Sequence, residues 1–333
     1  MDFARPAIRH TSAVLTAAML AITLGSATAL AQTAERYPAR PIRFIVPFPA
    51  GGATDIISRL IGERLGARLG QTVVMDNRPG ATGNIGLDLL AKAPADGYTI
   101  SLASSGVAIS ATLVPNLPFD PVRDFAHLTV AALVPNLYVI PGTLQVANLK
   151  EFVALVKQKP GGYNYASGGV GATNHVAVEL FNLVASVKLV HIPYKGSVQA
   201  MSDVMSGQTH LMLIGPPAAE QHVRSGRLRA LAIAYHRRIP SLPEVPTTAE
   251  AGVSGIEAAN WYGTVAPTKT PSAIVNRLNR EMVAALGSEE MKKQFAALGA
   301  ETQPGTPAAF ATFMRDEVGK WGKVVRAANI KPE

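Results

Sequence analysis

Two glycine-rich loops in this chain have the composition of a site that binds an anion. The first runs from Phe48 to Asp55, and the second runs from Ser167 to His175. Glycine lets the backbone come close to a ligand, and the free amides at the start of a helix attract a carboxylate or a phosphate. The pair therefore predicts two opposed halves of one binding site. For either loop taken alone, a plain turn between a strand and a helix is the alternative interpretation.

Both loops stand between an apolar run and an amphipathic pattern, which is the order strand, loop, helix. The run Ile42 to Pro47 precedes the first loop, and Tyr163 to Ala166 precedes the second. A further small polar loop, Ser104 to Gly106, is expected after a strand over residues 98–103. Ligands of open α/β sheets gather where the strands end, so we expect Ser105 beside the two glycine loops.

The same alternation of apolar runs and helical patterns continues along the chain and predicts an α/β fold with largely parallel sheets. Further strands are expected at residues 73–75, 128–140, 212–214, 231–234 and 260–266. Helices are expected at residues 149–158, 272–286, 289–298 and 307–328, with one more ending at residue 93.

The N-terminus has the features of an export signal. Arg5 and Arg9 precede an apolar stretch over residues 13–24 that is too short to span a membrane, and Ala29-Leu30-Ala31 fits signal peptidase. We expect cleavage after Ala31. The remaining chain, about 300 residues, suits two domains. We expect a signal peptide at 1–31, one domain formed by 32–135 with 260–333, and a second domain at 136–259.

Composition excludes several classes of function. The chain has no cysteine, so disulfides and thiolate metal sites are excluded. Its formal net charge of +8 suits anionic ligands, but the basic residues are scattered and form no stripe with aromatic partners, so no nucleic acid is expected.

An exported hydrolase is the competing class of function. The side chains that could supply a catalytic triad are Ser105, Ser167, His175, His191 and Asp203. The chain has neither a Gly-x-Ser-x-Gly elbow nor a His-Glu-x-x-His motif. We therefore expect no catalytic residue, no metal and no cofactor.

Many spaced motifs resemble the Bug receptors, the substrate-binding proteins of tripartite tricarboxylate transporters. The motifs are Tyr37-Pro38-Ala39-Arg40-Pro41-Ile42, Val46 to Asp55, Asn77-Arg78-Pro79-Gly80-Ala81, Asp96-Gly97-Tyr98-Thr99, Pro193-Tyr194-Lys195-Gly196, Gly226 to Ala232, Val245-Pro246-Thr247 with Glu250-Ala251-Gly252, and Trp261-Tyr262-Gly263. They follow the family's order and cover nearly all of the chain after the leader.

The resemblance implies a periplasmic-binding-protein-like fold, with two α/β domains that close on a small carboxylate in the cleft between them. It also implies membrane permease subunits or a sensor protein as partners, and we expect a monomer. The residues expected to bind the ligand are Phe48, Ala50, Gly51, Gly52, Ser105, Ser167, Gly169, Thr173, His175 and Asp203.

The second loop departs from the family pattern and leaves two roles open. Ala172 replaces the usual hydroxyl residue and Asn174 a smaller one, so Thr173 is expected to supply the hydroxyl contact. His175 either bonds the ligand or orients the loop. Asp203 either lies at the cleft, as the resemblance implies, or serves as a cap or solvated helix charge.

Structural roles are expected for four residues that also invite a functional interpretation. Asp55 would stabilise the first turn of a helix, because an unpaired carboxylate repels an anionic ligand. Lys195 is expected at the surface, and Trp261 and Tyr262 in the core and hinge. A bulky residue at Gly52 is expected to clash or to meet a forbidden backbone angle.

Overall fold

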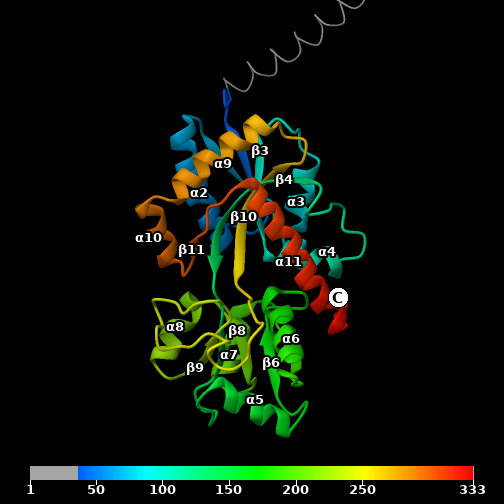
Figure 1. The fold of residues 1–333 in the computed structure, drawn as a ribbon, viewed down its shortest axis with the longest axis vertical. Helices are drawn as coiled ribbons and strands as arrows, with labels where there is room; N and C mark the ends of the chain where they lie inside the picture. Colours follow the sequence, from blue (N-terminus) through cyan, green and yellow to red (C-terminus); the bar gives the residue numbers. More distant parts are fainter. Residues whose placement is uncertain (1–36, 333) are drawn as a thin grey trace, which may run out of the picture. The chain divides into compact units, whose positions relative to one another are not determined.

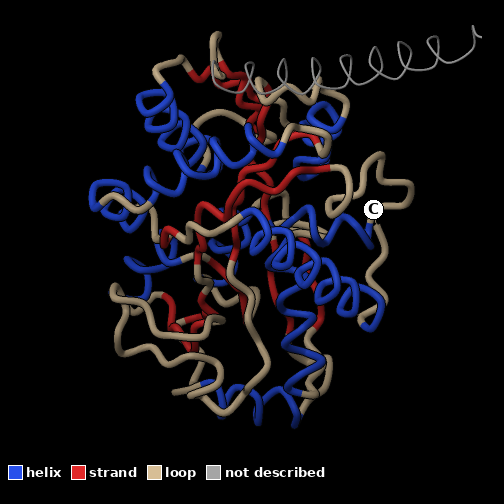
Figure 2. Tube along the Cα trace, turned by 45° about the horizontal axis from the view of Figure 1, so that its top comes forward, coloured by secondary structure: helices blue, strands red, loops and turns tan. Residues whose placement is uncertain are grey.

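The computed structural model describes residues 37–332, so the expected signal peptide lies outside the described residues. Residues 41–332 form one compact unit. Within this unit the strands form two sheets, and helices cover them on the outside (Figures 1 and 2).

The first sheet has six strands, in the order β11-β4-β10-β3-β1-β2 (Figure 1). Their bounds are β1 Ile42–Val46, β2 Val73–Asn77, β3 Thr99–Ser104, β4 Phe125–Val134, β10 Asn260–Pro267 and β11 Glu301–Thr302. Its helices are α2 Ala53–Leu69, α3 Asn84–Ala91, α4 Ser105–Leu113, α9 Ser272–Leu286, α10 Glu289–Ala297 and α11 Pro307–Ala327, with a 3₁₀ turn at Ala81–Gly83. Both ends of the described chain thus build one sheet.

The second sheet has five strands, in the order β7-β6-β8-β5-β9, all from the middle of the chain. Their bounds are β5 Leu137–Pro141, β6 Asn164–Ser167, β7 Val190–Pro193, β8 Leu211–Ile214 and β9 Leu228–Ile233. Its helices are α5 Leu149–Gln158, α6 Thr173–Ala185, α7 Ser197–Met205 and α8 Pro216–Arg224.

The expectation of largely parallel sheets is wrong, because both sheets are mixed. β1 is parallel to β2 and β3, and β6 is parallel to β7 and β8. In contrast, β10 is antiparallel to β3 and β4, and β5 is antiparallel to β8 and β9. The strand directions differ because the chain enters β5 and β10 from the other sheet without an intervening helix. The parallel strands, in contrast, are joined by helical crossovers.

The two segments that pass between the sheets are hydrogen-bonded to each other. The chain changes sheet between β4 and β5, and it returns between β9 and β10. The Asn136 side-chain amide donates to the Ala258 carbonyl at 2.6 Å, and the Ala234 amide donates to the Asn136 carbonyl at 2.8 Å. The division into domains at these crossings stays a prediction.

The expected polar loop Ser104 to Gly106 is wrong, because Ser105 is the first residue of α4. Burial explains the helix. Val107, Ala108 and Ile109 are at most 2% exposed, so tertiary packing outweighs the low helix propensity of the serines and the glycine. β7, α8 and β11 were also not expected from the sequence.

Trp261 has the packing role that the sequence predicts. Its side chain is 1% exposed and lies edge-on to Phe310 and Phe313 of α11. Its indole and that of Trp321 donate to one carboxylate oxygen of the buried Glu317, at 2.8 and 2.9 Å. These contacts fix β10 against α11. In residues 37–332, no helix combines the length and apolar character needed to cross a membrane.

Candidate ligand-binding site

The first glycine loop joins β1 to α2 as predicted, and it is exposed from Pro49 to Ala53. Gly51 has a φ of +84°, which favours glycine. Gly52 is the N-cap of α2 with a φ of −80° and has no side chain to cap the helix. The first amides of α2 are therefore not satisfied by a capping side chain, as an anion site requires.

The expected effect of a side chain at Gly52 is corrected by this geometry. Its backbone is extended, and an added Cβ would meet only the Pro49 carbonyl, at 3.8 Å. Neither a clash nor a forbidden angle results. The conformational requirement for glycine lies one residue earlier, at Gly51.

Asp55, in the first turn of α2, holds the first loop in shape. Its carboxylate accepts hydrogen bonds from the Gly51 amide at 3.0 Å, from Arg59 Nε at 2.9 Å and from Asn77 Nδ2 at 2.9 Å. The Arg59 hydrogen bond is the largest of the effects that lower the pKa of Asp55 to about 2. Asn77 also donates to the Phe48 carbonyl at 3.1 Å. The Gly51 amide is thus engaged within the loop, and Ala50 stands exposed at its tip.

Ser167, fully buried at the end of β6, holds the second loop together. Its Oγ lies 2.6 Å from His191 Nε2 on the neighbouring strand β7 and accepts the Gly169 amide at 3.1 Å. Gly169 has a φ of +127°, so this position also favours glycine. Asn174 Oδ1 accepts a hydrogen bond from the Gly168 amide at 3.2 Å. Asn174, which replaces a smaller residue of the family pattern, thus helps to hold the loop.

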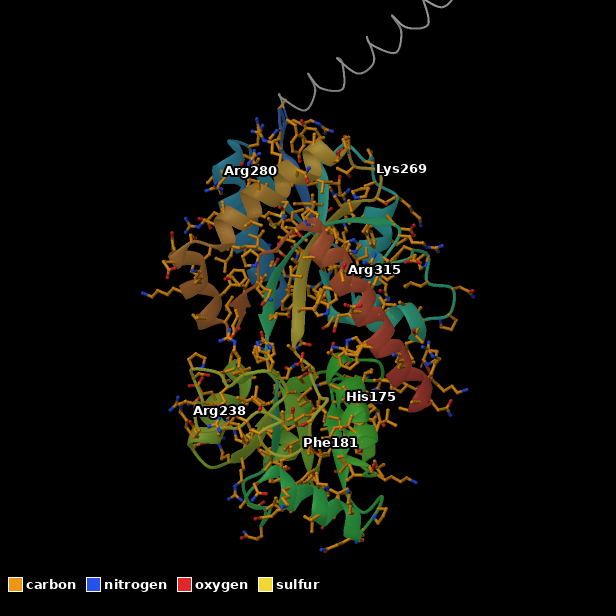
Figure 3. The ribbon with its side chains drawn as sticks, in the orientation of Figure 1. His175, Phe181, Arg238, Lys269, Arg280 and Arg315 are labelled. Carbon is orange, nitrogen blue, oxygen red and sulfur yellow. The ribbon has the colours of Figure 1, made fainter. Side chains whose placement is uncertain are left out.

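His175 orients the second loop, which is one of the two roles left open by the sequence. Its Nδ1 accepts the Gly171 amide at 3.0 Å, and its ring stacks on that of His191. Burial and the nearby His191 lower the pKa of His175 to about 3, and burial lowers the pKa of His191 to about 4. Figure 3 labels His175 on α6, with Phe181 further along the same helix.

Ser105 and Thr173 join the two sheets at this site. The two hydroxyl oxygens lie 3.2 Å apart, and Ser105 also bonds Asn260 Oδ1 at 3.3 Å. Thr173 is the first residue of α6, whose N-cap Ala172 makes no side-chain capping bond. The starts of α4 and α6 therefore meet, each directly after a strand or glycine loop.

Asp203 is connected to the second loop through Tyr194. It is half-buried in α7 and accepts the Tyr194 hydroxyl at 2.7 Å, while the Tyr194 amide donates to the Ser167 carbonyl. Burial and the Asp203 carboxylate raise the pKa of Tyr194 to about 12. Asp203 thus supports the segment beside the loop. Lys195 is exposed, as expected.

The geometry does not assemble a hydrolase triad among the described residues. Ser167 and His191 form a close pair, but Ser167 is fully buried and cannot meet a substrate from solvent. The only hydrogen bond found for the Asp203 carboxylate in residues 37–332 comes from Tyr194 rather than a histidine. The described residues also contain no group of three or more His, Cys, Asp or Glu side chains that could hold a metal ion.

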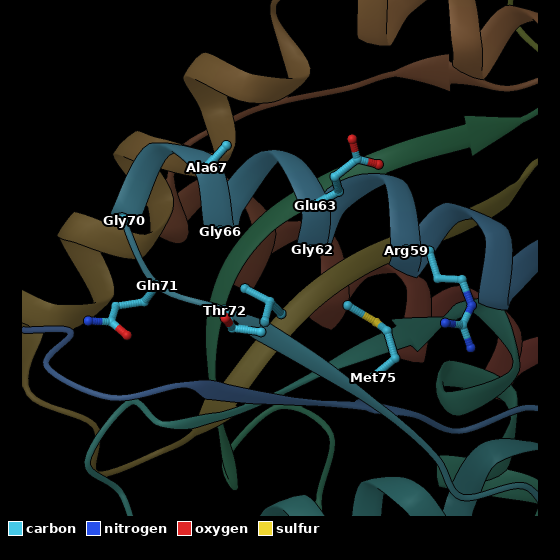
Figure 4. Close-up of a pocket in the computed structure, with 10 residues that line it drawn as sticks. Arg59, Gly62, Glu63, Gly66, Ala67, Gly70, Gln71, Thr72 and Met75 are labelled. Carbon is cyan, nitrogen blue, oxygen red and sulfur yellow. The ribbon is translucent and has the colours of Figure 1, made fainter.

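A cavity of about 660 Å³ lies along the groove between α2 and the edge strand β2 (Figure 4), and neither Ser105 nor Thr173 lines it. Gly62 and Gly66 face the strand there, and a Cβ on Gly62 would lie 2.0 Å from Met75 Cε. The glycines therefore serve close packing of α2 on β2. The groove contains none of the predicted ligand-binding residues.

The sequence missed the residues that support the loops. Asn77, Asn260 and His191 come from strands: Asn77 and His191 reach the two glycine loops, and Asn260 reaches the start of α4. The parallel register that pairs Tyr165 with His191 explains how His191 arrives beside Ser167. A polar residue within a short apolar run, as in Val190-His191-Ile192, is the one signal that the sequence offers.

Comparison with known proteins agrees with this geometry. The model of the tripartite tricarboxylate transporter family receptor matches residues 57–330. Protein BugT of Bordetella pertussis is 39% identical over 301 residues, which cover 90% of this chain and 92% of BugT.

Two solved structures share the fold over most of the chain. R. palustris Rpa4515 with adipate is 37% identical, with a TM-score of 0.77 over 89% of this chain and all of that one. MatC from Rhodopseudomonas palustris with bound malate is 30% identical, with a TM-score of 0.73 over 87% of this chain and all of MatC. The expected periplasmic-binding-protein-like α/β fold, with its two sheets, is thus confirmed. Sequence and fold together show that the chain belongs to the tripartite tricarboxylate transporter receptor family, the Bug receptors.

Proposed function

We propose that this receptor captures a small carboxylate between its two glycine loops, for uptake or sensing, with no catalytic step and no cofactor. The observation that carries the proposal is the 3.2 Å contact of Ser105 with Thr173, which brings the uncapped start of α6 to the first sheet. Uncapped helix starts attract carboxylates. The adipate and malate bound to the two relatives support the same class of ligand.

In this proposal the ligand contacts are divided between the two loops. Amides after Gly52 and at the uncapped start of α6 bind one carboxylate, directly or through ordered water, while Gly169 lets the second loop come close to it. Phe48 and Ala50 border the ligand, and the hydroxyls of Ser105 and Thr173 exchange their present hydrogen bonds for hydrogen bonds to it. Ser167, His175 and Asp203 act behind the loop by fixing its shape.

The cellular setting is part of the same proposal. The chain is exported to the periplasm, its signal peptide is cleaved after Ala31, and it works as a monomer. Its two domains are 32–135 with 260–333, and 136–259. When closed on the ligand, it is recognised by membrane permease subunits or by a sensor protein.

A thermal-shift screen of the chain from Gln32 onward tests the ligand class. Adipate, malate and hexanoate are compared with neutral and cationic compounds of similar size. A ligand at about 100 times its Kd stabilises by about 2.7 kcal/mol, a clear rise in Tm. The proposal is contradicted if no carboxylate raises the Tm, or if generic esters are hydrolysed.

Closure is tested separately with a ligand from that screen. Small-angle scattering is expected to give a smaller radius of gyration with ligand, because a ligand that touches both loops favours the closed state. Amides of both loops are expected to gain protection from hydrogen exchange together. Protection of one loop alone, at constant radius, would refute a site shared by the two domains.

A further inference from the structure

A third loop at the same edge of the first sheet holds an unusual backbone. Four successive residues have positive φ angles, namely Gly80, Ala81, Thr82 and Gly83 at +132°, +47°, +57° and +94°. Such angles are ordinary for glycine, but they are rare for a β-branched residue. Thr82 is therefore held in a conformation that its own side chain disfavours.

Neighbours on both sides hold this loop in place. A Cβ on Gly83 would lie 3.3 Å from the Phe48 ring, so the loop packs against the first glycine loop. A Cβ on Gly106 would lie 3.1 Å from the Thr82 Cγ2 methyl, so Thr82 packs on the first turn of α4 beside Ser105. Thr82 thus stands between the loop of Phe48 and the contact of Ser105 with Thr173.

The Thr82 hydroxyl is available for a ligand. The methyl packs on Gly106, the side chain is exposed, and its hydroxyl has no hydrogen-bond partner in residues 37–332. Strained residues that neighbouring structure keeps in place gather at binding sites. An exposed, strained donor beside two predicted ligand loops has the properties of a specificity residue.

We propose that the Thr82 hydroxyl binds the second acidic group of a dicarboxylate whose first carboxylate lies at the glycine loops. This inference rests on the proposed function and names the class of ligand. The parallel strands β1, β2 and β3 end at one edge of the sheet, so the loop of Phe48, the loop of Thr82 and the start of α4 gather there. A ligand held at the loop of Phe48 can extend toward Thr82.

The test compares Thr82→Ala with Thr82→Ser, which differ by one hydroxyl and share the loss of the β-branch. Calorimetry measures the Kd of adipate, malate and hexanoate for both variants, for the wild type and for the exposed control Thr143→Ala. Thr82→Ala is expected to weaken adipate and malate at least tenfold and hexanoate less than twofold. Thr82→Ser is expected to keep wild-type affinities, and both variants to melt no lower than the wild type.

Each other result decides against the inference. Unchanged adipate binding in Thr82→Ala, or equal loss of all three acids in both variants, would show that Thr82 only shapes the loop. A wild type that binds hexanoate but neither dicarboxylate overturns this inference and leaves the proposed function intact. A wild type that binds none of the acids contradicts both.

Discussion

His175 and His191 stack face to face, with ring centroids 3.8 Å apart and planes 8° from parallel. His175 comes from the first turn of α6 and His191 from β7, so the stack joins two elements behind the second glycine loop. Each ring holds part of that loop, through the Gly171 amide and through Ser167 Oγ. Protonation would place two positive charges in contact and would remove the acceptor that Gly171 uses.

The stability of the protein is therefore expected to fall in mild acid. The pKa values of His175 and His191 drop from 6.5 to about 3 and about 4 on folding, so the unfolded chain binds more protons between these values and pH 6.5. Their stabilising effect is complete above pH 6.5 and decreases as the pH falls through this window, by about 3 kcal/mol for each histidine at pH 4.

Urea unfolding of the wild type and of His191→Asn between pH 4 and 8 measures this effect, with the exposed His236→Asn as control. The pH dependence of His191→Asn is expected to be flatter, and that of the control to match the wild type. Parallel curves for all three proteins would exclude the histidine stack as the cause.

The two glycines of the first loop are expected to respond differently to alanine. Gly51→Ala strains a backbone with a φ of +84° and lowers stability by about 1–2 kcal/mol. Gly52→Ala meets only the Pro49 carbonyl, at 3.8 Å, and changes stability by about 0.5 kcal/mol or less, because the loss of a favoured N-cap residue is offset by the lower entropy of the unfolded chain. Thermal unfolding of the two variants checks this, and an equal loss in both would contradict the backbone argument.

Asp55→Asn is expected to lower stability near neutral pH by about 1–2 kcal/mol, because it weakens the charged hydrogen bond with Arg59. The folded pKa of Asp55 is depressed to about 2, so its contribution is present above pH 3.8 and disappears as the pH falls through 2. Denaturation at pH 7 and pH 2.5, with the exposed Asp316→Asn as control, tests both statements. A deficit that stays constant with pH would argue for packing instead.

Glu317→Leu is expected to cost about 2–5 kcal/mol, because it leaves the buried indole N–H groups of Trp261 and Trp321 without an acceptor. Glu317→Gln keeps an acceptor oxygen and is expected to lose less. Urea unfolding ranks the two variants. Equal losses in the two variants would indicate that the ion pair with Lys320, which both variants remove, carries the stabilisation, and not the indole contacts.

The sequence predicted local units better than long-range partners. The strand, loop and helix around Gly51 and around Gly169 were found because glycine and hydrophobic periodicity are local signals. The helix at Ser105 was missed because burial of Val107 and Ile109, which depends on the whole fold, decides it. Mixed strand directions were missed for the same reason.

The candidate site divides in the same way. Its loops could be predicted, but the side chains that shape them could not. His191 reaches Ser167 only through strand pairing, and Asn77 reaches Asp55 from 22 residues away. Ligand contact by any of the predicted residues stays a prediction.

The placement of β10 between β3 and β4 affects the order in which the protein matures. All five strands of the second sheet lie between residues 137 and 233, so this sheet can form from one continuous stretch of chain. The first sheet needs β10 before β4 can join β3, which requires pairing across more than 100 residues. Pairing of distant segments is slow. During synthesis from the N-terminus, the second sheet can therefore be completed first, although it begins later in the chain. The first sheet stays incomplete until the C-terminal part, with β10, has been made.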